Sequence, residues 1–191
     1  MRTVLFGGTF DPIHNAHMEV AREVLRRFEV ARVVFVPAAK PPHKGAGAFA
    51  SFDDRVRMVE LACAGEPRFE VSRIEENFAR SYSILTIEKM LGQGSGPLSF
   101  LIGADAFAEI ETWHRWRDVA RLVEFVVVTR PGAVWRLPEG ARVTELSGLW
   151  LPISSSEIRR GLAAGDTDVP VPAAALDWIR AKGLYCRPDL A

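Results

Sequence analysis

The sequence predicts a doubly wound α/β fold, as a single domain that covers residues 1–191. Apolar runs of strand length alternate along the chain with helical patterns, as they do in a parallel sheet built from βαβ units. Residues 33–36 (VVFV) and 125–128 (FVVV) are continuously apolar, which is typical of strands buried on both faces. Ligands of such sheets bind beyond the carboxyl ends of the strands, so the loops there are the candidate site.

The first elements are a strand, a helix and a second strand. Residues 3–6 (TVLF) begin the sheet, and Arg32–Val36 continue it. Between them, a helix from about Ala16 to Phe28 carries apolar residues at helical spacing, namely Val20, Ala21, Val24, Leu25 and Phe28. Its opposite face carries the charged residues Glu19, Arg22, Glu23, Arg26 and Arg27.

A long Pro/Gly-rich loop, Pro37–Ala50, follows the second strand, and its length indicates function or mobility. Ser51 then caps a helix that places Val56, Val59 and Cys63 on one side. A strand near Phe69–Val71 and a helix near Ser83–Leu91 come next.

The last part of the chain repeats the alternation and ends in helices. A strand at Leu98–Ile102 leads to Gly103, and a strand at Glu124–Thr129 follows a short helical piece. The C-terminal part, about residues 154–191, is predicted to be helical. It holds a helix opened by Ser154 and a last helix near Ala173–Lys182 that Gly183 ends.

Charge and composition limit the partners. Lys+Arg and Asp+Glu both total 24, and this balance argues against a nucleic-acid partner, whose backbone favours a basic protein. No apolar run is long enough to span a bilayer, so no membrane partner is expected. Cys63 and Cys186 form no CxxC pair, which fits a cytoplasmic protein without a disulfide or cysteine–zinc scaffold. The oligomeric state stays open, and a homo-oligomer is one option.

The loop after the first strand carries the strongest chemical pattern, residues 7–17 (GGTFDPIHNAH). Gly7 and Gly8 let the backbone approach a ligand, and the helix start that follows favours phosphate. His14 and His17 lie three residues apart, so both rings can donate hydrogen bonds to a triphosphate from one side. Two alternatives remain: a tight turn with packing histidines, or a metal site that uses Asp11, His14 and His17.

Three later segments place polar or aromatic residues near strand ends. Ser81 is a candidate cap of the helix near residues 83–91. Asp105 follows a strand, so its carboxylate could accept ribose hydroxyls or cap the next helix. Trp113 could be a stacking platform, although a tryptophan pair such as Trp113 and Trp116 is more often part of a core.

The helix start at residues 153–159 (ISSSEIR) has the spacing of a capping box between Ser154 and Glu157. Arg159 lies in the next turn and can reach an anion held at the same helix N-terminus. This pattern predicts both a stable helix and a second phosphate contact. We expect the neighbouring Arg160 to be solvated.

Residues 7–17 resemble the GGTFDPxHxGH signature of the bacterial nicotinate mononucleotide adenylyltransferases, within the HxGH nucleotidyltransferase superfamily. Further similar motifs follow in order up to Arg159: residues 41–44 (PPHK), 81–86 (SYSILT), 103–105 (GAD), 113–116 (WHRW) and 153–159. The resemblance implies a Rossmann-like nucleotidyltransferase fold. Three positions depart from the family pattern, with Ala16 in place of Gly, Ser83 in place of Thr and Leu85 in place of Asp.

The resemblance also implies roles for individual residues. The catalytic set would be His14, His17, Lys44 and Arg159. ATP would contact Gly7, Gly8, Thr9, Phe10, His14, His17, Ile153, Ser154, Ser155 and Arg159. The acceptor would contact His43, Lys44, Ser83, Ile84, Thr86, Gly103, Asp105, Trp113 and His114, with Trp113 stacked on the pyridine ring.

The implied reaction joins ATP and nicotinate mononucleotide into deamido-NAD and releases pyrophosphate, with Mg²⁺ bridging the ATP phosphates. The acceptor phosphate is already ionised at neutral pH, so no strong general base is needed. Phosphopantetheine and CTP are alternative substrates within the superfamily, and a nucleotide sensor that has lost catalysis is an alternative from another class. The WHRW and PPHK segments favour nicotinate.

Overall fold

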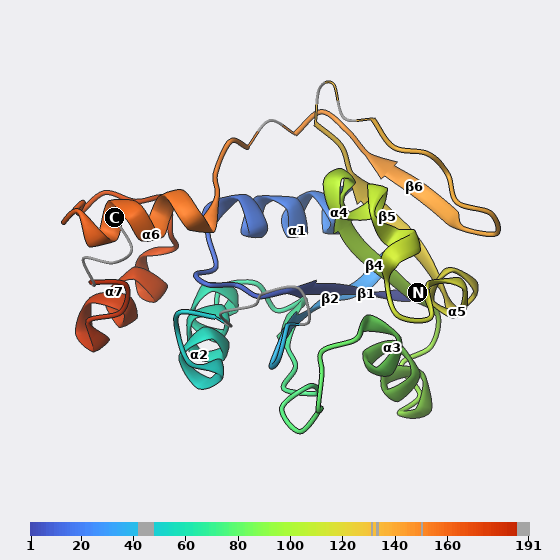
Figure 1. Ribbon diagram of the computed structural model, residues 1–191, viewed down its shortest axis with the longest axis horizontal. Helices are drawn as coiled ribbons and strands as arrows, with labels where there is room; N and C mark the ends of the chain where they lie inside the picture. The colour runs from blue at the N-terminus through green and yellow to red at the C-terminus, as the bar shows by residue number, and fades with distance from the viewer. Residues whose placement is uncertain (42–47, 131, 133, 150, 187–191) are drawn as a thin grey trace.

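The computed structural model describes residues 1–41, 48–130, 132, 134–149 and 151–186. Its centre is a six-stranded sheet in the order β3-β2-β1-β4-β5-β6, and all neighbouring strands are parallel (Figure 1). The strands are β1 (Arg2–Gly8), β2 (Val30–Pro37), β3 (Phe69–Val71), β4 (Leu98–Gly103), β5 (Val123–Val128) and β6 (Arg142–Leu146). This topology confirms the doubly wound α/β prediction.

Helices cover both faces of the sheet, and α1 and α3 lie on opposite sides of it (Figure 1). The helices are α1 (Asn15–Arg27), α2 (Phe52–Cys63), α3 (Ser83–Gly92), α4 (Ala104–Ala108), the 3₁₀ turn η1 (Ile110–Thr112), α5 (Trp116–Leu122), α6 (Ser155–Ala163) and α7 (Ala173–Lys182). Alternate strand residues feed two buried clusters. Val4 packs with residues of α1, α2 and α7, whereas Leu5 packs with residues of α3, α4 and α5.

Most predicted elements are confirmed, because their local signals agree with their packing. Val20, Ala21, Val24 and Leu25 of α1 are buried, as the helical spacing predicts. The Ser51 hydroxyl accepts a hydrogen bond from the Asp54 N–H at 3.1 Å, and Gly183 ends α7 with φ +60°. The short helical piece before β5 consists of α4, η1 and α5.

One local prediction is wrong, and one strand was missed. Glu23 was expected on the solvent face of α1, but its side chain is only 2% exposed, because Arg26 and Arg27 both pair with its carboxylate. Strand β6 was not predicted at all. Its sequence, RVTEL, is short and mostly polar, as befits a strand that pairs on one side with β5 at the edge of the sheet.

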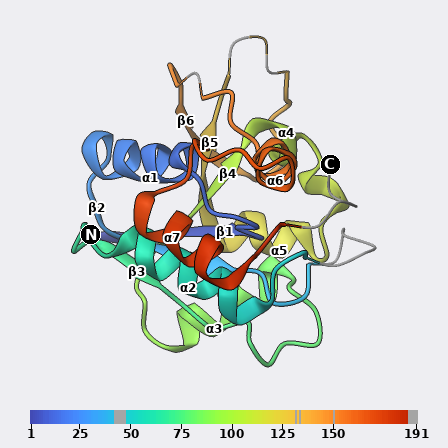
Figure 2. The ribbon, with the colours of Figure 1, turned by 90° about the vertical axis from the view of Figure 1, so that its left-hand side faces the viewer.

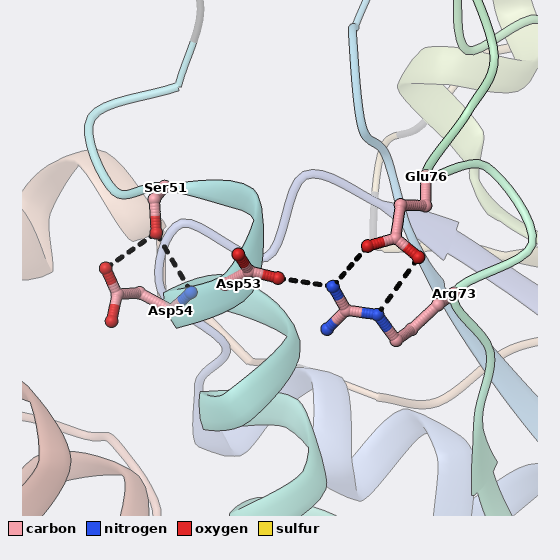
Figure 3. A network of polar contacts seen from close by, with 5 residues as sticks. All are labelled: Ser51, Asp53, Asp54, Arg73 and Glu76. Carbon is pink, nitrogen blue, oxygen red and sulfur yellow. Dashed lines mark hydrogen bonds and ion pairs between the residues drawn. The ribbon is translucent and has the colours of Figure 1, made fainter.

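The last helix, α7, lies against α2 at one end of the molecule (Figure 1 and Figure 2). The N-terminal turn of α2 is in turn linked to the segment between β3 and α3. The Arg73 guanidinium pairs with Asp53 and with Glu76, the latter at 2.6 Å (Figure 3). Exposed pairs of this kind contribute little stability. Within the described ranges, no helix has the length and apolar character needed to cross a membrane.

Candidate active site

The candidate site lies beyond the carboxyl ends of β1 and β4, where the strand order reverses. Three cavities, A, B and C, open there. Cavity A, about 200 Å³, is lined among others by Gly8, Glu75, Ser83, Thr86, Gly103 and Trp113. Cavity B, about 250 Å³, is lined by Gly8, Thr9, Ala38, Pro41, Ser81, Tyr82, Ser83, Trp113 and His114. Cavity C, about 240 Å³, is lined among others by Ala16, Gly103, Asp105, Thr129, Arg130 and Leu151.

A larger cavity of about 590 Å³ lies at the opposite, amino ends of the strands, against Arg2, Val30 and Leu98. Parallel sheets bind ligands at the carboxyl ends, and the residues with chemical signatures are also there. Cavities A, B and C therefore form the candidate site despite their smaller volumes.

The glycine turn after β1 is required by packing. A Cβ on Gly8 would stand 2.9 Å from the Phe10 ring, and Phe10 itself adopts a left-handed φ of +48°. The Phe10 side chain is only 3% exposed and packs edge-on against Phe6. A nucleotide can therefore meet Phe10 only through its backbone.

Asp11 anchors this turn to two distant parts of the chain. Its carboxylate is fully buried and accepts hydrogen bonds from the Phe49 N–H at 2.7 Å, the Ala50 N–H at 3.1 Å and the Tyr185 hydroxyl at 2.7 Å. The buried Arg55 guanidinium donates to the Thr9 carbonyl at 2.7 Å and holds the same turn from the other side. Sequence reasoning missed Arg55 and Tyr185, because these contacts join residues far apart in the chain.

These internal hydrogen bonds argue against the metal alternative with Asp11, His14 and His17, because the Asp11 carboxylate already accepts from three protein donors. In the part of the chain that the structure describes, no group of three or more His, Cys, Asp or Glu side chains is arranged to hold a metal.

His14 and His17 lie together, as their spacing predicts. Their rings stack with centroids 3.6 Å apart and planes 22° apart. The His14 backbone N–H donates to Nδ1 of His17 at 3.2 Å, so neutral His17 carries its proton on Nε2, which remains able to donate. Burial lowers the pKa of His14 to about 4. Burial, with a smaller contribution from His14, also lowers the pKa of His17 well below its usual value.

Helix α6 brings Arg159 to the same turn. Its guanidinium donates to the Asp11 carbonyl at 2.7 Å and lies over the Phe49 ring at 4.3 Å. The Ser155 hydroxyl donates to the Pro12 carbonyl at 3.0 Å, so the start of α6 is joined directly to the loop before α1. The two ends of the predicted phosphate site, far apart in sequence, are thus in contact.

The helix starts differ in detail from the predicted ones. The Ser154 hydroxyl accepts from the Glu157 N–H at 3.2 Å, as predicted, but the Glu157 carboxylate accepts from that hydroxyl at 2.8 Å rather than completing a reciprocal backbone bond. The Ile153 N–H donates to the Leu151 carbonyl at 2.8 Å. At α1, the Asn15 N–H already donates to the Pro170 carbonyl at 2.9 Å, so that amide is not available to phosphate.

Aromatic side chains surround cavities A and B. Trp113 lines both cavities, is partly buried and packs edge-on against Phe100 at 5.8 Å. His114 stacks on Tyr82 with centroids 4.5 Å apart. Trp113 thus combines the two alternatives, because it packs on the core while part of its ring faces the cavities.

The predicted acceptor residues of α3 lie at different depths. Ser83 lines both cavities, whereas Ile84 is fully buried and Thr86 is 2% exposed. The alternative in which Ser81 caps α3 is wrong, because Tyr82 occupies the N-cap position. The Ser81 hydroxyl instead accepts from the Lys40 N–H at 2.9 Å and so ties the start of the 37–50 loop to this wall. His43 and Lys44 lie outside the described residues.

Asp105 faces cavity C rather than cavities A and B. It lies inside α4, where Gly103 is the N-cap, so its predicted alternative role as a cap is wrong. Its carboxylate pairs with Arg130 at 2.8 Å, and both side chains are exposed. Gly103 lines cavities A and C and therefore marks the boundary between them.

Glu75 is a site residue that sequence reasoning missed. It follows β3 in an irregular segment, and no spacing or turn signal marks it. Its side chain is 6% exposed and lines cavity A, and one carboxylate oxygen accepts from the Thr86 hydroxyl at 2.5 Å.

Comparison with known proteins gives consistent matches over most of the chain. The family profile described as cytidylyltransferase-like matches residues 5–161. A probable nicotinate-nucleotide adenylyltransferase of Solibacter usitatus is 57% identical over 188 residues, which cover 97% of this chain and 100% of the relative. A probable nicotinate-nucleotide adenylyltransferase of Geotalea daltonii is 38% identical over 212 residues, covering 97% and 98%.

Among solved structures, the nicotinic acid mononucleotide adenylyltransferase of Plasmodium falciparum complexed with NaAD is similar, with a TM-score of 0.78 at 17% identity. That match covers 97% of this chain and 98% of the other. Its complex with APC gives a TM-score of 0.74 at 18% identity, covering 97% of both chains. At these identities the solved structures support the fold.

Proposed function

The chain belongs to the cytidylyltransferase-like family and, within it, to the nicotinate-nucleotide adenylyltransferases, and from that premise we propose that it transfers the AMP part of ATP to nicotinate mononucleotide. The products are deamido-NAD and pyrophosphate, in the biosynthesis of NAD. The observation that carries this proposal is the turn between β1 and α1. It holds the stacked rings of His14 and His17 and binds the Arg159 guanidinium, while Gly8 before it lines cavity A and Ala16 after it lines cavity C.

The reaction needs placement and charge stabilisation more than proton transfer. A phosphate oxygen of nicotinate mononucleotide attacks the α-phosphorus of ATP in line with the leaving pyrophosphate; one P–O bond forms and one breaks. Neutral His17 donates from Nε2, and Arg159 supplies a fixed positive charge held against Asp11. Lys44 and His43 are proposed to meet phosphate groups on the evidence of the motif alone.

We assign ATP to cavity C and the acceptor to cavities A and B. Ala16, Thr129 and Arg130 surround the first. Asp105 lies in the same cavity, so we reassign it from the acceptor to ATP, and its exposed carboxylate would accept hydrogen bonds from the ribose hydroxyls. Trp113 offers an aromatic face to the second pair, as stacking on a pyridine ring requires. Gly7, Gly8 and Thr9 and the start of α6 would contact the phosphates between them.

A divalent cation, most simply Mg²⁺, fits this site as a companion of ATP. Asp11 is fully engaged with protein donors, so the protein offers few carboxylate ligands, and Mg²⁺ binds readily through phosphate oxygens and water. Such an ion would neutralise charge on the phosphates. The balanced charge of the chain supports small-molecule partners and no nucleic acid, and we place the reaction in the cytoplasm.

The decisive experiment incubates the purified protein with ATP, Mg²⁺ and one acceptor at a time, and measures pyrophosphate and the dinucleotide product. Nicotinate mononucleotide should give stoichiometric deamido-NAD, and phosphopantetheine should give none. The same assay with CTP in place of ATP tests the nucleotide. ATP binding without pyrophosphate release from any acceptor would instead support the sensor alternative.

A further inference from the structure

Glu75 stands out within cavity A because it brings a negative charge into an otherwise uncharged wall. It is the only charged side chain among the described residues that line this cavity. Its neighbours in the lining are apolar, small or hydroxyl-bearing, including Ala38, Ser81, Ser83, Phe100 and Trp113. The side chain is 94% buried, since only 6% of its surface is exposed.

The carboxylate is only half satisfied by the protein. Oε1 accepts from the Thr86 hydroxyl at 2.5 Å, whereas Oε2 is buried and has no hydrogen-bond partner in the described part of the chain. The nearby Arg55 guanidinium donates to the Thr9 and Ala50 carbonyls instead. Burying a carboxylate oxygen without a partner is costly, so the unpaired Oε2 points to a further partner, which is either a bound water or a ligand.

The position of Glu75 is fixed from both sides. The Ser72 N–H donates to the Phe35 carbonyl at 2.9 Å, and the Lys89 ammonium donates to the Ile74 carbonyl at 3.3 Å. Directly after Glu75, Glu76 is held by Arg73, which also pairs with Asp53 of α2 (Figure 3). These contacts hold the backbone on either side of Glu75, and the Thr86 hydroxyl holds the carboxylate itself.

On the basis of the proposed function, we propose that Glu75 binds the acceptor by its charge, pairing with the positively charged ring of nicotinate mononucleotide. The ring nitrogen of this compound carries the ribose, so the ring is a pyridinium cation. A cation is stabilised by an aromatic face and by a nearby carboxylate, and cavity A offers Trp113 and Glu75 together.

This assignment orients the acceptor. The carboxylate of the nicotinate would be repelled by Glu75, so it must point toward cavity B, where Tyr82 and His114 stack. It also contributes to specificity, because an acceptor without a cationic ring, such as phosphopantetheine, gains nothing from Glu75 and leaves its carboxylate unpaired.

The test compares two acceptors that differ in ring charge: nicotinate mononucleotide and its 1,4-dihydropyridine form, which keeps the ribose and phosphate but has a neutral ring. The wild type should have a KM at least about tenfold lower for the cationic ring, the scale expected for opposite charges at close range. Glu75→Gln, which keeps the shape and a bond to Thr86, should bring the ratio of the two KM values close to one. The KM for ATP should not change.

Glu76→Gln is the matched control, because it removes the same charge from the neighbouring, exposed position outside the cavity. It should keep the wild-type preference. If Glu75→Gln weakens both acceptors equally, Glu75 accepts a hydroxyl hydrogen bond or only supports the fold, and the charge proposal is overturned. If the variant does not fold, the wild type still provides a test, because equal KM values for its two acceptors would by themselves overturn the charge proposal.

A binding experiment separates this inference from the proposed function. The dissociation constants of both acceptors are measured by tryptophan fluorescence, without ATP, so that no turnover occurs. A protein that makes no dinucleotide but binds the cationic ring more tightly refutes the proposed function and supports the role of Glu75. A protein that makes deamido-NAD but binds both rings equally supports the proposed function and refutes the role of Glu75.

Discussion

The two ends of the candidate site are built in different ways. At the nucleotide end, Asp11, Arg55, Arg159 and Tyr185 form a buried set of hydrogen bonds that joins the first turn of the chain to its last described residues. At the acceptor end, partly exposed aromatic rings surround two open cavities, and Glu75 is the one charge in cavity A among the residues described.

The difference follows from what each end must do. Groups that stabilise charge in a transition state must be held in place, because a small misplacement costs much of their effect. Groups that bind an acceptor ring need a shaped surface and tolerate more variation. Of the three departures from the family pattern, Ser83 lines both acceptor cavities. Leu85 lies on the same helix but packs against the core, and Ala16 adds one methyl group in cavity C.

The largest effect is expected for His17→Ala at the nucleotide end. Loss of one donor aimed at developing charge should lower kcat by about a hundredfold or more, and ATP binding should weaken less. The matched control is His114→Ala, an exposed histidine at the acceptor end, which should keep kcat near normal. Steady-state kinetics on both variants measure this difference. Similar losses of kcat in the two variants would contradict the distinction between the nucleotide end and the acceptor end.

Acid should weaken the nucleotide end through His14. Its pKa is about 4 in the folded protein because of burial, so between pH 6.5 and 4 the unfolded chain takes up a proton that native His14 does not. Stability is therefore unaffected above this window and falls within it, by about 3 kcal/mol in total for this residue. Denaturant unfolding at pH 7, 6 and 5 should show a smaller loss in His14→Asn than in the wild type. If the free energy of unfolding falls equally with pH in the two proteins, the burial of a neutral His14 is contradicted.

The sheet and its helices could be predicted from sequence because their signals are local. Continuous apolar runs marked β2 and β5, and helical spacing with Ser51, Ser154 and Gly183 marked the helix ends. Strand β6 has neither signal, since it gains its conformation from pairing with β5. The burial of Glu23 depended on two arginines folding over it, which helical spacing alone does not show.

The motif residues of the site could likewise be predicted, but not what holds them. The pairing of His14 with His17 and the approach of Arg159 follow from short patterns at helix starts. Tyr185 meets Asp11 across 174 positions, and nothing local to either residue indicates the contact. Glu75 looks like any solvated glutamate in sequence, and only the fold puts it in a cavity wall.

Trp113→Ala tests the acceptor end directly. Loss of an aromatic face for the ring should raise the KM for nicotinate mononucleotide by an amount that corresponds to about 1–3 kcal/mol, with the KM for ATP nearly unchanged. Trp116→Ala is the control, because Trp116 does not line either acceptor cavity. An early thermal transition with equal loss of both substrates would mean that Trp113 serves the core alone.

The two tyrosines of the chain offer a matched pair, one at each end. Tyr185→Phe removes a hydroxyl donor from the buried Asp11 carboxylate, so it should cost about 1–2 kcal/mol of stability and lower kcat severalfold by loosening the turn that holds Arg159. Tyr82→Phe removes a hydroxyl at the acceptor end and should leave stability and kcat nearly unchanged. Denaturant unfolding and kinetics on both variants measure these effects. Equal changes in stability and kcat in the two variants would show that Asp11 does not anchor the turn.

The smallest effect is expected at Leu85, where the family pattern has an aspartate. Leu85 is partly buried and packs against the cluster of α3, α4 and α5, and it is absent from the lining of cavities A and B. Its side chain thus faces packing neighbours rather than the acceptor. Leu85→Asp should then keep activity on nicotinate mononucleotide within about tenfold of the wild type, since the acceptor surface is unchanged.

The same substitution should lower the free energy of unfolding by about 1 kcal/mol, because a half-buried apolar contact is lost and a carboxylate is partly desolvated. Leu85→Asn is the control that introduces polarity without charge, and kinetics and denaturant unfolding on both variants separate packing from electrostatics. If the wild type ignores nicotinate mononucleotide while Leu85→Asp accepts it, the carboxylate of the family pattern acts on the acceptor after all. The acceptor end would then be as strictly specified as the nucleotide end, and the contrast between them would fail.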